Sequence, residues 1–176
     1  MTTRPEVLGQ LANAKNNYVL GLSALALFAT PDAHKILECQ HASFGTYSVD
    51  FRQVALLLRV DADREVAVKE FANMLLRALV KEGFELIKTY AEESGQSQVL
   101  KRQEWYQFAR LIRNCLAHDF RFSFGRHDES VLPVSWRSRT ILANMHGQQL
   151  PLEFFGYVQA WELFRDFQTF VECDMR

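Results

Sequence analysis

Residues 61–93 read DADREVAVKEFANMLLRALVKEGFELIKTYAEE, and this stretch decides the fold class. Its apolar residues fall mostly three or four positions apart, with Lys, Arg and Glu between them; they are Val66, Phe71, Met74, Leu75, Leu79, Leu86 and Ile87. This spacing is typical of an amphipathic helix. Ser94-Gly95 follows, and glycine suits the left-handed residue that ends many helices. The sequence therefore predicts one long helix over residues 61–93.

Helical spacing recurs on both sides of this segment, and the stretch between residues 30 and 49 reads as a loop. The further predicted helices are residues 6–29, a short buried helix at 51–60, residues 99–118, and a last helix that Pro151 opens. The short stretch at 51–60 also fits a strand. The last helix has a broad apolar stripe that includes Phe155, Phe164 and Phe167, which is typical of a core or dimer surface.

The apolar pattern changes its period after Asp119. Arg121-Phe-Ser-Phe-Gly alternates polar and apolar residues, and short apolar stretches follow at Val134–Trp136 and Ile141-Leu142. Alternation of this kind favours short strands. We therefore expect an all-α (mainly α) protein: one domain over residues 1–176, a bundle of four to five helices with a small β-hairpin or meander inserted at about residues 121–146, before the last helix.

Composition excludes several classes of protein. The 176 residues include 20 Lys and Arg against 21 Asp and Glu, with 48% hydrophobic residues. These values do not fit a disordered chain, a collagen or a uniformly basic nucleic-acid coat. The three cysteines form no closely spaced pair, so a reducing compartment, the cytoplasm, is the simplest expectation.

The uncharged stretch from Tyr18 to Ala29 raises the question of a membrane segment. Its twelve residues are fewer than the roughly 20 that a spanning helix needs. A secretory leader can be this short, but the helical pattern continues upstream through Val7, Leu8 and Leu11. We therefore expect a buried first helix and no membrane partner.

Polar and ionisable residues crowd the end of the predicted helix at 99–118. The sequence there is Arg110-Leu-Ile-Arg113-Asn114-Cys-Leu-Ala-His118-Asp119-Phe120. Asn114 and His118 are four residues apart and share a helix face, so Asn114 is placed to orient the imidazole. Residues 101–140 also hold eight Lys and Arg against four Asp and Glu. A local basic surface of this kind is what a polyanion site needs.

The pattern Arg113-Asn114-x-x-x-His118 resembles the signature of the HEPN superfamily, and the helical layout over most of the chain is similar to it. The resemblance implies a helical homodimer that sets two such motifs face to face. It also implies a metal-independent endoribonuclease of the toxin or defence-related type, needing no cofactor, with RNA as substrate and an antitoxin or regulatory protein as a further partner.

The chemistry of RNA cleavage fits these residue types. Attack by the 2′-hydroxyl needs a base and an acid, and histidine serves as either near neutral pH. His118 would be that group, Arg113 would bind the charged phosphorane, and Asn114 would orient His118 or donate to phosphate. Arg110, Asp119 and Arg121 border the motif, and we expect them to contact the substrate.

The motif departs from some HEPN toxins at one position. There a Tyr two residues after the His is modified by a partner nucleotidyltransferase, whereas this chain has Phe120. Phenylalanine lacks the hydroxyl group, so that mode of neutralisation is in doubt while cleavage is unaffected.

Three alternatives remain open at this point. The motif can be structural, with Arg113 paired to Asp119 or Glu104 and His118 a cation at a helix end. The chain can also be a non-catalytic HEPN-like module that binds or regulates RNA or protein. A third reading uses the loop histidines His34 and His41, near Cys39, in unrelated chemistry that metal analysis would test.

Overall fold

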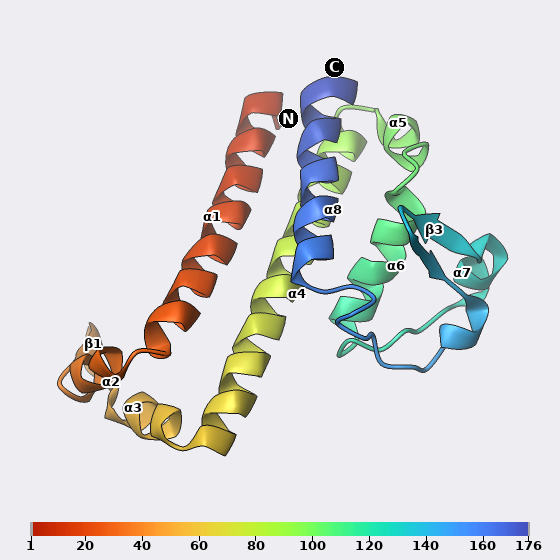
Figure 1. Ribbon diagram of the computed structural model, residues 1–176. Helices are drawn as coiled ribbons and strands as arrows, with labels where there is room; N and C mark the ends of the chain where they lie inside the picture. Colours follow the sequence, from red (N-terminus) through yellow and green to blue (C-terminus); the bar gives the residue numbers. More distant parts are fainter. Residues whose placement is uncertain (1, 176) are drawn as a thin grey trace. The chain divides into compact units, whose positions relative to one another are not determined.

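The computed structural model describes residues 2–175, and it is mainly helical, as predicted (Figure 1). The α-helices are α1 (Arg4–Phe28), α2 (Pro31–Glu38), α3 (Arg52–Arg59), α4 (Asp61–Glu93), α5 (Ser97–Lys101), α6 (Tyr106–Ala117), α7 (Arg126–Val131) and α8 (Tyr157–Thr169). A 3-10 turn spans Ala143–Met145, and a π-helical turn spans Phe170–Asp174. The strands are β1 (His41–Phe44), β2 (Tyr47–Asp50), β3 (Val134–Trp136) and β4 (Arg139–Ile141). The long helix predicted at 61–93 is confirmed as α4.

The chain forms two compact units, which are described separately. Unit one holds the residues up to Asn16 and those from Leu76 onward, and unit two holds Asn17–Leu75. Helices α1 and α4 each contribute to both units. The expectation of a single domain stays a prediction.

An aromatic core joins α4, α6 and α8 in unit one. Phe84 of α4 lies with its ring centroid 6.1 Å from that of Phe167 of α8, which is 5.1 Å from Trp105 at the start of α6. Gly83 permits this packing, because a Cβ there would lie 2.9 Å from two ring carbons of Phe164. These contacts hold α6 in place along one side, which is buried.

The predicted β insertion is present as one hairpin rather than a three-stranded meander. Strands β3 and β4 pair antiparallel, with Val134 opposite Ile141 and Trp136 opposite Arg139. The stretch after Asp119 forms only an isolated bridge, between Arg121 and Gln149. Helix α7, which we did not expect, follows it. Asp128 caps this helix by accepting a hydrogen bond of 2.9 Å from the Gly125 N–H.

The predicted loop at 30–49 holds regular structure in unit two. Pro31 occupies the start of α2, where a missing N–H costs nothing. Strands β1 and β2 then form a hairpin whose tight turn contains Gly45 with φ +61°. Apolar periodicity did not indicate either element, because polar residues are scattered through this stretch.

Two helices predicted to be buried are largely exposed. In α1, the side chains of Val19, Leu20 and Leu27 are exposed, Leu20 at 69%. In α3, the buried residues are Ala55 and Leu58, while neighbouring leucines face solvent. The expectation of a buried first helix is therefore wrong for its second half, because no described element of unit two covers that face. Within residues 2–175, no helix is long and apolar enough to cross a membrane.

Two predicted helix boundaries also differ. The helix expected at 99–118 is split into α5 and α6 by a turn around Gln103. The last helix begins at Tyr157 rather than Pro151, because Phe154 and Phe155 both donate backbone hydrogen bonds to the Pro151 carbonyl in a turn. Gly156 then caps α8 in extended conformation, with its N–H bonded to Gln159 Oε1 at 3.0 Å.

Candidate functional site

Helix α6 places the motif in unit one at the end of a firmly packed segment. Its buried side includes Phe108, Ile112 and Leu116, which are all at 0% exposure. Arg113 and Asn114 lie at the margin of this buried side and are half-buried. Because apolar residues anchor one face of α6, the polar residues at the margin of that face stay accessible.

Arg113 is held by two neighbours. Its Nη2 forms an ion pair with Glu85 Oε1 of α4, and its Nη1 donates to Asn114 Oδ1 at 3.0 Å. Its Nε is buried without a hydrogen-bond partner. The pairing with Asp119 or Glu104 that a purely structural motif predicted is thus wrong, because α4 brings Glu85 against this face. The guanidinium is oriented and retains N–H donors for a ligand.

His118 stands at the C-terminal cap of α6 with an exposed side chain. Its backbone N–H donates to the carbonyls of Asn114 and Cys115, both at 3.1 Å. The imidazole has no hydrogen-bond partner among residues 2–175, and the side-chain amide of Asn114 contacts Arg113 instead. The expected role of Asn114 in orienting His118 is therefore not seen, whereas the ring remains open to a substrate.

The chain turns sharply after His118 through two left-handed residues. Asp119 has φ +51° and Phe120 has φ +57°, and for non-glycine residues this conformation costs about 1–3 kcal/mol each. Arg77 of α4 contacts both: its Nη2 lies 3.6 Å from Asp119 Oδ1, and its guanidinium carbon lies 5.4 Å from the centre of the Phe120 ring. The Phe120 ring is buried, and the backbone carbonyl of Phe120 accepts a 2.6 Å hydrogen bond from the Leu150 N–H. These contacts hold the strained turn that follows His118.

Sequence reasoning did not identify Arg77 or Glu85 as site residues. Both lie in the long helix and look like ordinary charges between apolar residues. They are eight residues apart, which is about two helical turns, so they lie on the same face of α4. Only the packing of α4 against α6 shows that this face meets the motif.

The three residues expected to contact substrate have different surroundings. Arg121 is exposed close to the motif, and its Nη1 donates to the Gly147 carbonyl. Asp119 is exposed and paired with Arg77. Arg110 faces α7, where its Nη1 lies 2.6 Å from Asp128 Oδ1. The structure therefore brings Asp119 and Arg121 beside His118, while Arg110 is engaged in a structural pair; their roles toward substrate stay predictions.

The Arg110–Asp128 pair changes the acidity of the carboxyl group. Burial of Asp128 raises its pKa, but the hydrogen bond from Gly125 and the contacts with Arg110 outweigh burial and hold the pKa below its usual range. Both side chains are largely buried, at 19% and 13% exposure. This ion pair ties α6 to the β insertion and so supports the motif indirectly.

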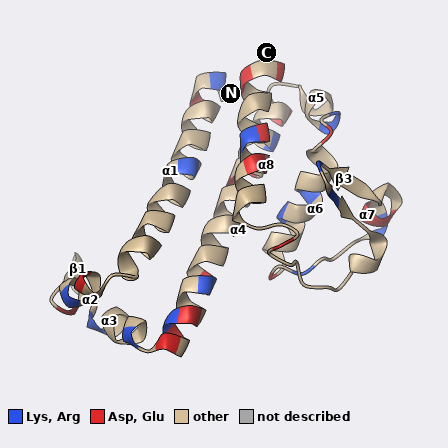
Figure 2. Ribbon diagram, in the orientation of Figure 1, with Lys and Arg blue, Asp and Glu red and all other residues tan. Residues whose placement is uncertain are grey.

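Basic and acidic residues both occur along α4 (Figure 2), whereas α6 carries Arg110 and Arg113 and no acidic residue. At the motif, Arg77 pairs with Asp119 and Arg113 pairs with Glu85, while His118 and Arg121 form no ion pair among residues 2–175. The candidate site thus combines a titratable imidazole with guanidinium groups, which suits a phosphodiester more than a cationic ligand.

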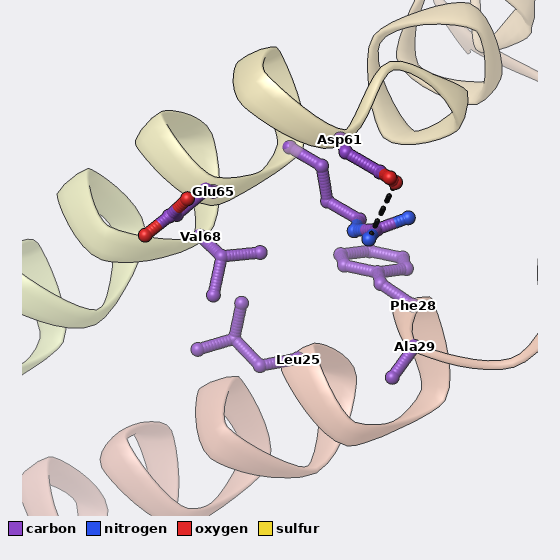
Figure 3. A pocket seen from close by; sticks show the side chains of 7 residues that line it. Leu25, Phe28, Ala29, Asp61, Glu65 and Val68 are labelled. Atoms are coloured by element: carbon purple, nitrogen blue, oxygen red, sulfur yellow. Dashed lines mark ion pairs between the residues drawn. The ribbon is translucent and has the colours of Figure 1, made fainter.

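A separate cavity of about 550 Å³ lies in unit two between the end of α1 and the start of α4. Leu25 and Val68 point toward each other from the two helices, and Arg64 forms a 2.8 Å ion pair with Asp61 at one end (Figure 3). The lining residues are Leu25, Phe28, Ala29, Asp61, Arg64, Glu65 and Val68. None of these lining residues is a histidine or a cysteine.

The loop histidines lie on different elements of unit two. His34 is on α2, where its Nε2 lies 2.8 Å from the Phe28 carbonyl oxygen, and His41 begins β1. Among residues 2–175, no group of three or more His, Cys, Asp and Glu side chains is arranged to hold a metal ion. The alternative built on these histidines therefore gains no support from the geometry.

Comparison of the chain with protein-family models, with curated proteins and with solved structures finds no match.

Proposed function

We propose that this protein is a cytoplasmic, metal-independent endoribonuclease of the HEPN type, active as a homodimer. The observation that carries the proposal is the exposed imidazole of His118, without a hydrogen-bond partner among residues 2–175, in the same motif as the oriented guanidinium of Arg113. An imidazole can accept or donate a proton, and a guanidinium group that is fixed in orientation can bind a charged phosphorane. The resemblance of Arg113-Asn114-x-x-x-His118 to the HEPN signature supports RNA as the substrate.

In the proposed reaction the 2′-hydroxyl of RNA attacks the adjacent phosphate, and the 5′-oxygen of the next nucleotide leaves. One His118 accepts the hydroxyl proton, and a second His118, from the other subunit, donates a proton to the leaving oxygen. Arg113 binds the charged phosphorane with its remaining N–H donors. The products are a 2′,3′-cyclic phosphate and a free 5′-hydroxyl.

The distribution of exposed apolar residues supports association with another chain. Of the seventeen large apolar side chains exposed in the described residues, fourteen lie between Val19 and Met74. Concentrations of this kind mark interaction surfaces. Light scattering tests it: the wild type is expected to be a dimer, and the Leu20→Glu and Leu27→Glu variants more monomeric.

The decisive test is incubation of the purified protein with total RNA and transfer RNA in excess chelator. The wild type is expected to yield fragments with 2′,3′-cyclic phosphate ends, and His118→Ala is expected to yield none while melting at nearly the same temperature. His127→Ala, which changes an exposed histidine on α7, is the matched control and should cleave normally. Cleavage by His118→Ala at the wild-type rate would reject the assignment.

One observation favours a second candidate, a non-catalytic module that binds RNA or a regulatory protein such as an antitoxin. Arg113 already has a counter-ion, Glu85, which reduces its attraction for a phosphorane. In that case the folded dimer binds RNA or its protein partner without turnover, and His118→Ala alters affinity alone.

A further inference from the structure

The face of α4 that meets the motif carries a third charged residue. Arg77 contacts Asp119 and Glu85 contacts Arg113, so α4 runs antiparallel to α6 along this seam. Lys81 lies four residues from each and therefore on the same face, between the two contacts. Its side chain is exposed, and no ion pair is formed by it within the described chain.

Arg77 is less firmly satisfied than Arg113. Its distance to the Asp119 carboxylate is 3.6 Å, and that carboxylate is 96% exposed, so the pair is weak in water. Its Nε, like that of Arg113, is buried and has no hydrogen-bond partner. The guanidinium rests on the Phe120 ring, which orients its plane. An oriented cation with a loosely held counter-ion is suited to exchange that counter-ion for a phosphate.

We propose that Arg77 and Lys81 form a second phosphate-binding position on α4, which holds a neighbouring phosphate of the same nucleic-acid strand whose reacting phosphate lies at Arg113 and His118. The inference rests on the proposed function, which identifies this nucleic-acid strand as RNA. Arg77 and Lys81 are one helical turn apart, about 6 Å along α4. Asp119 occupies the position in the free protein and is displaced when the strand binds.

This arrangement gives Asp119 a defined role. As a carboxylate beside Arg77 it competes with phosphate for the same guanidinium, so the affinity for a strand is lower than the cations alone would produce. Replacing Asp119 by Asn removes the competing charge and retains the size of the side chain. The variant is expected to bind the strand more tightly than the wild type.

The test measures binding of a fluorescein-labelled 2′-O-methyl oligoribonucleotide, which has no free 2′-hydroxyl and is not cleaved by the proposed reaction. Each phosphate contact removed from a single strand lowers the slope of log affinity against log salt by about 0.7. Because Arg77 and Lys81 hold one phosphate, the Arg77→Ala/Lys81→Ala variant is expected to lower the slope by about 0.7. The matched control is Lys101→Ala/Arg102→Ala, which removes the same charge from exposed residues at the C-terminal end of α5. Its slope should match the wild type.

A single variant keeps the test valid if the double variant does not fold. Lys81→Glu changes an exposed side chain without described contacts, so it should fold normally and still weaken binding beyond the control. Equal salt slopes for wild type, Lys81→Glu and the double variant would overturn the inference, even if the wild type cleaves RNA. Binding that depends on Arg77 and Lys81 without any cleavage would reject the ribonuclease and retain the phosphate position. No binding by the wild type, with no cleavage, would reject both.

Discussion

Glu85 of α4 and Arg113 of α6 form an ion pair that couples the long helix to the motif. Both side chains are about one-third exposed, and the pair leaves the guanidinium fixed in orientation. A catalytic cation that is fixed before substrate arrives avoids reorganisation during the reaction. The same pair reduces the net charge at the site, so Glu85 has opposing effects on orientation and attraction.

Replacing Glu85 by Gln tests which effect dominates. We expect kcat for RNA cleavage to fall roughly tenfold or more with little change in KM, because a misplaced guanidinium loses contact with the transition state. Initial-rate measurements on one labelled RNA check this. Glu82→Gln, an exposed neighbour on α4, is the control and should leave both constants unchanged. A rise in kcat would show that Glu85 inhibits the site by neutralising Arg113.

The Arg110–Asp128 pair is expected to contribute to stability. Asp128→Asn should lower the free energy of unfolding at neutral pH by about 2 kcal/mol, because Arg110 loses a charged hydrogen-bond partner. Chemical denaturation measures this against Glu129→Gln, an exposed neighbour, which should change it little. The pKa of Asp128 is lower in the folded state, so its contribution is present above the unfolded pKa and lost as the pH falls through the folded value. The difference between wild type and Asp128→Asn should therefore shrink in acid, and a constant difference would contradict this account.

Gly83 is expected to resist substitution despite its place within a helix. Gly83→Ala gains about 1 kcal/mol from helix propensity, but the new Cβ meets two ring carbons of Phe164 at 2.9 Å. Overpacking of this kind costs about 1–3 kcal/mol, so the net effect should be destabilising. Gly9→Ala is the matched control, because nothing lies within 4 Å of its Cβ, and it should stabilise the protein. Thermal unfolding of both variants checks the prediction, which fails if Gly83→Ala melts higher than the wild type.

The three cysteines should differ in reactivity. Burial raises the pKa of the Cys115 thiol to about 12, whereas Cys39 and Cys173 are exposed. Because the thiolate is the reactive form, a disulfide reagent at neutral pH should modify Cys39 and Cys173 in the native protein and Cys115 only after unfolding. Mass spectrometry of the digested protein locates the adducts. Rapid labelling of Cys115 under native conditions would show that α6 opens locally.

The sequence predicted well those elements whose apolar period is long and regular. Helix α4 agrees with its predicted limits because its apolar residues repeat over many turns. Short elements such as α2, α7 and the β1–β2 hairpin escaped prediction. Local bonds, such as that between Gly125 and Asp128, determine them more than any periodic pattern.

For the candidate site, the sequence by itself determined the motif: Arg113 and Asn114 lie near the end of one helix, and His118 directly follows its last residue. Only the tertiary structure decided their partners. Glu85 and Arg77 come from a distant part of the chain, and their contacts depend on how α4 packs against α6. The left-handed turn at Asp119 and Phe120 depends likewise on Arg77 and on the bond to Leu150, because phenylalanine, unlike aspartate, has no local preference for that conformation. Contacts between segments distant in sequence arise from packing, which periodicity along one segment does not encode.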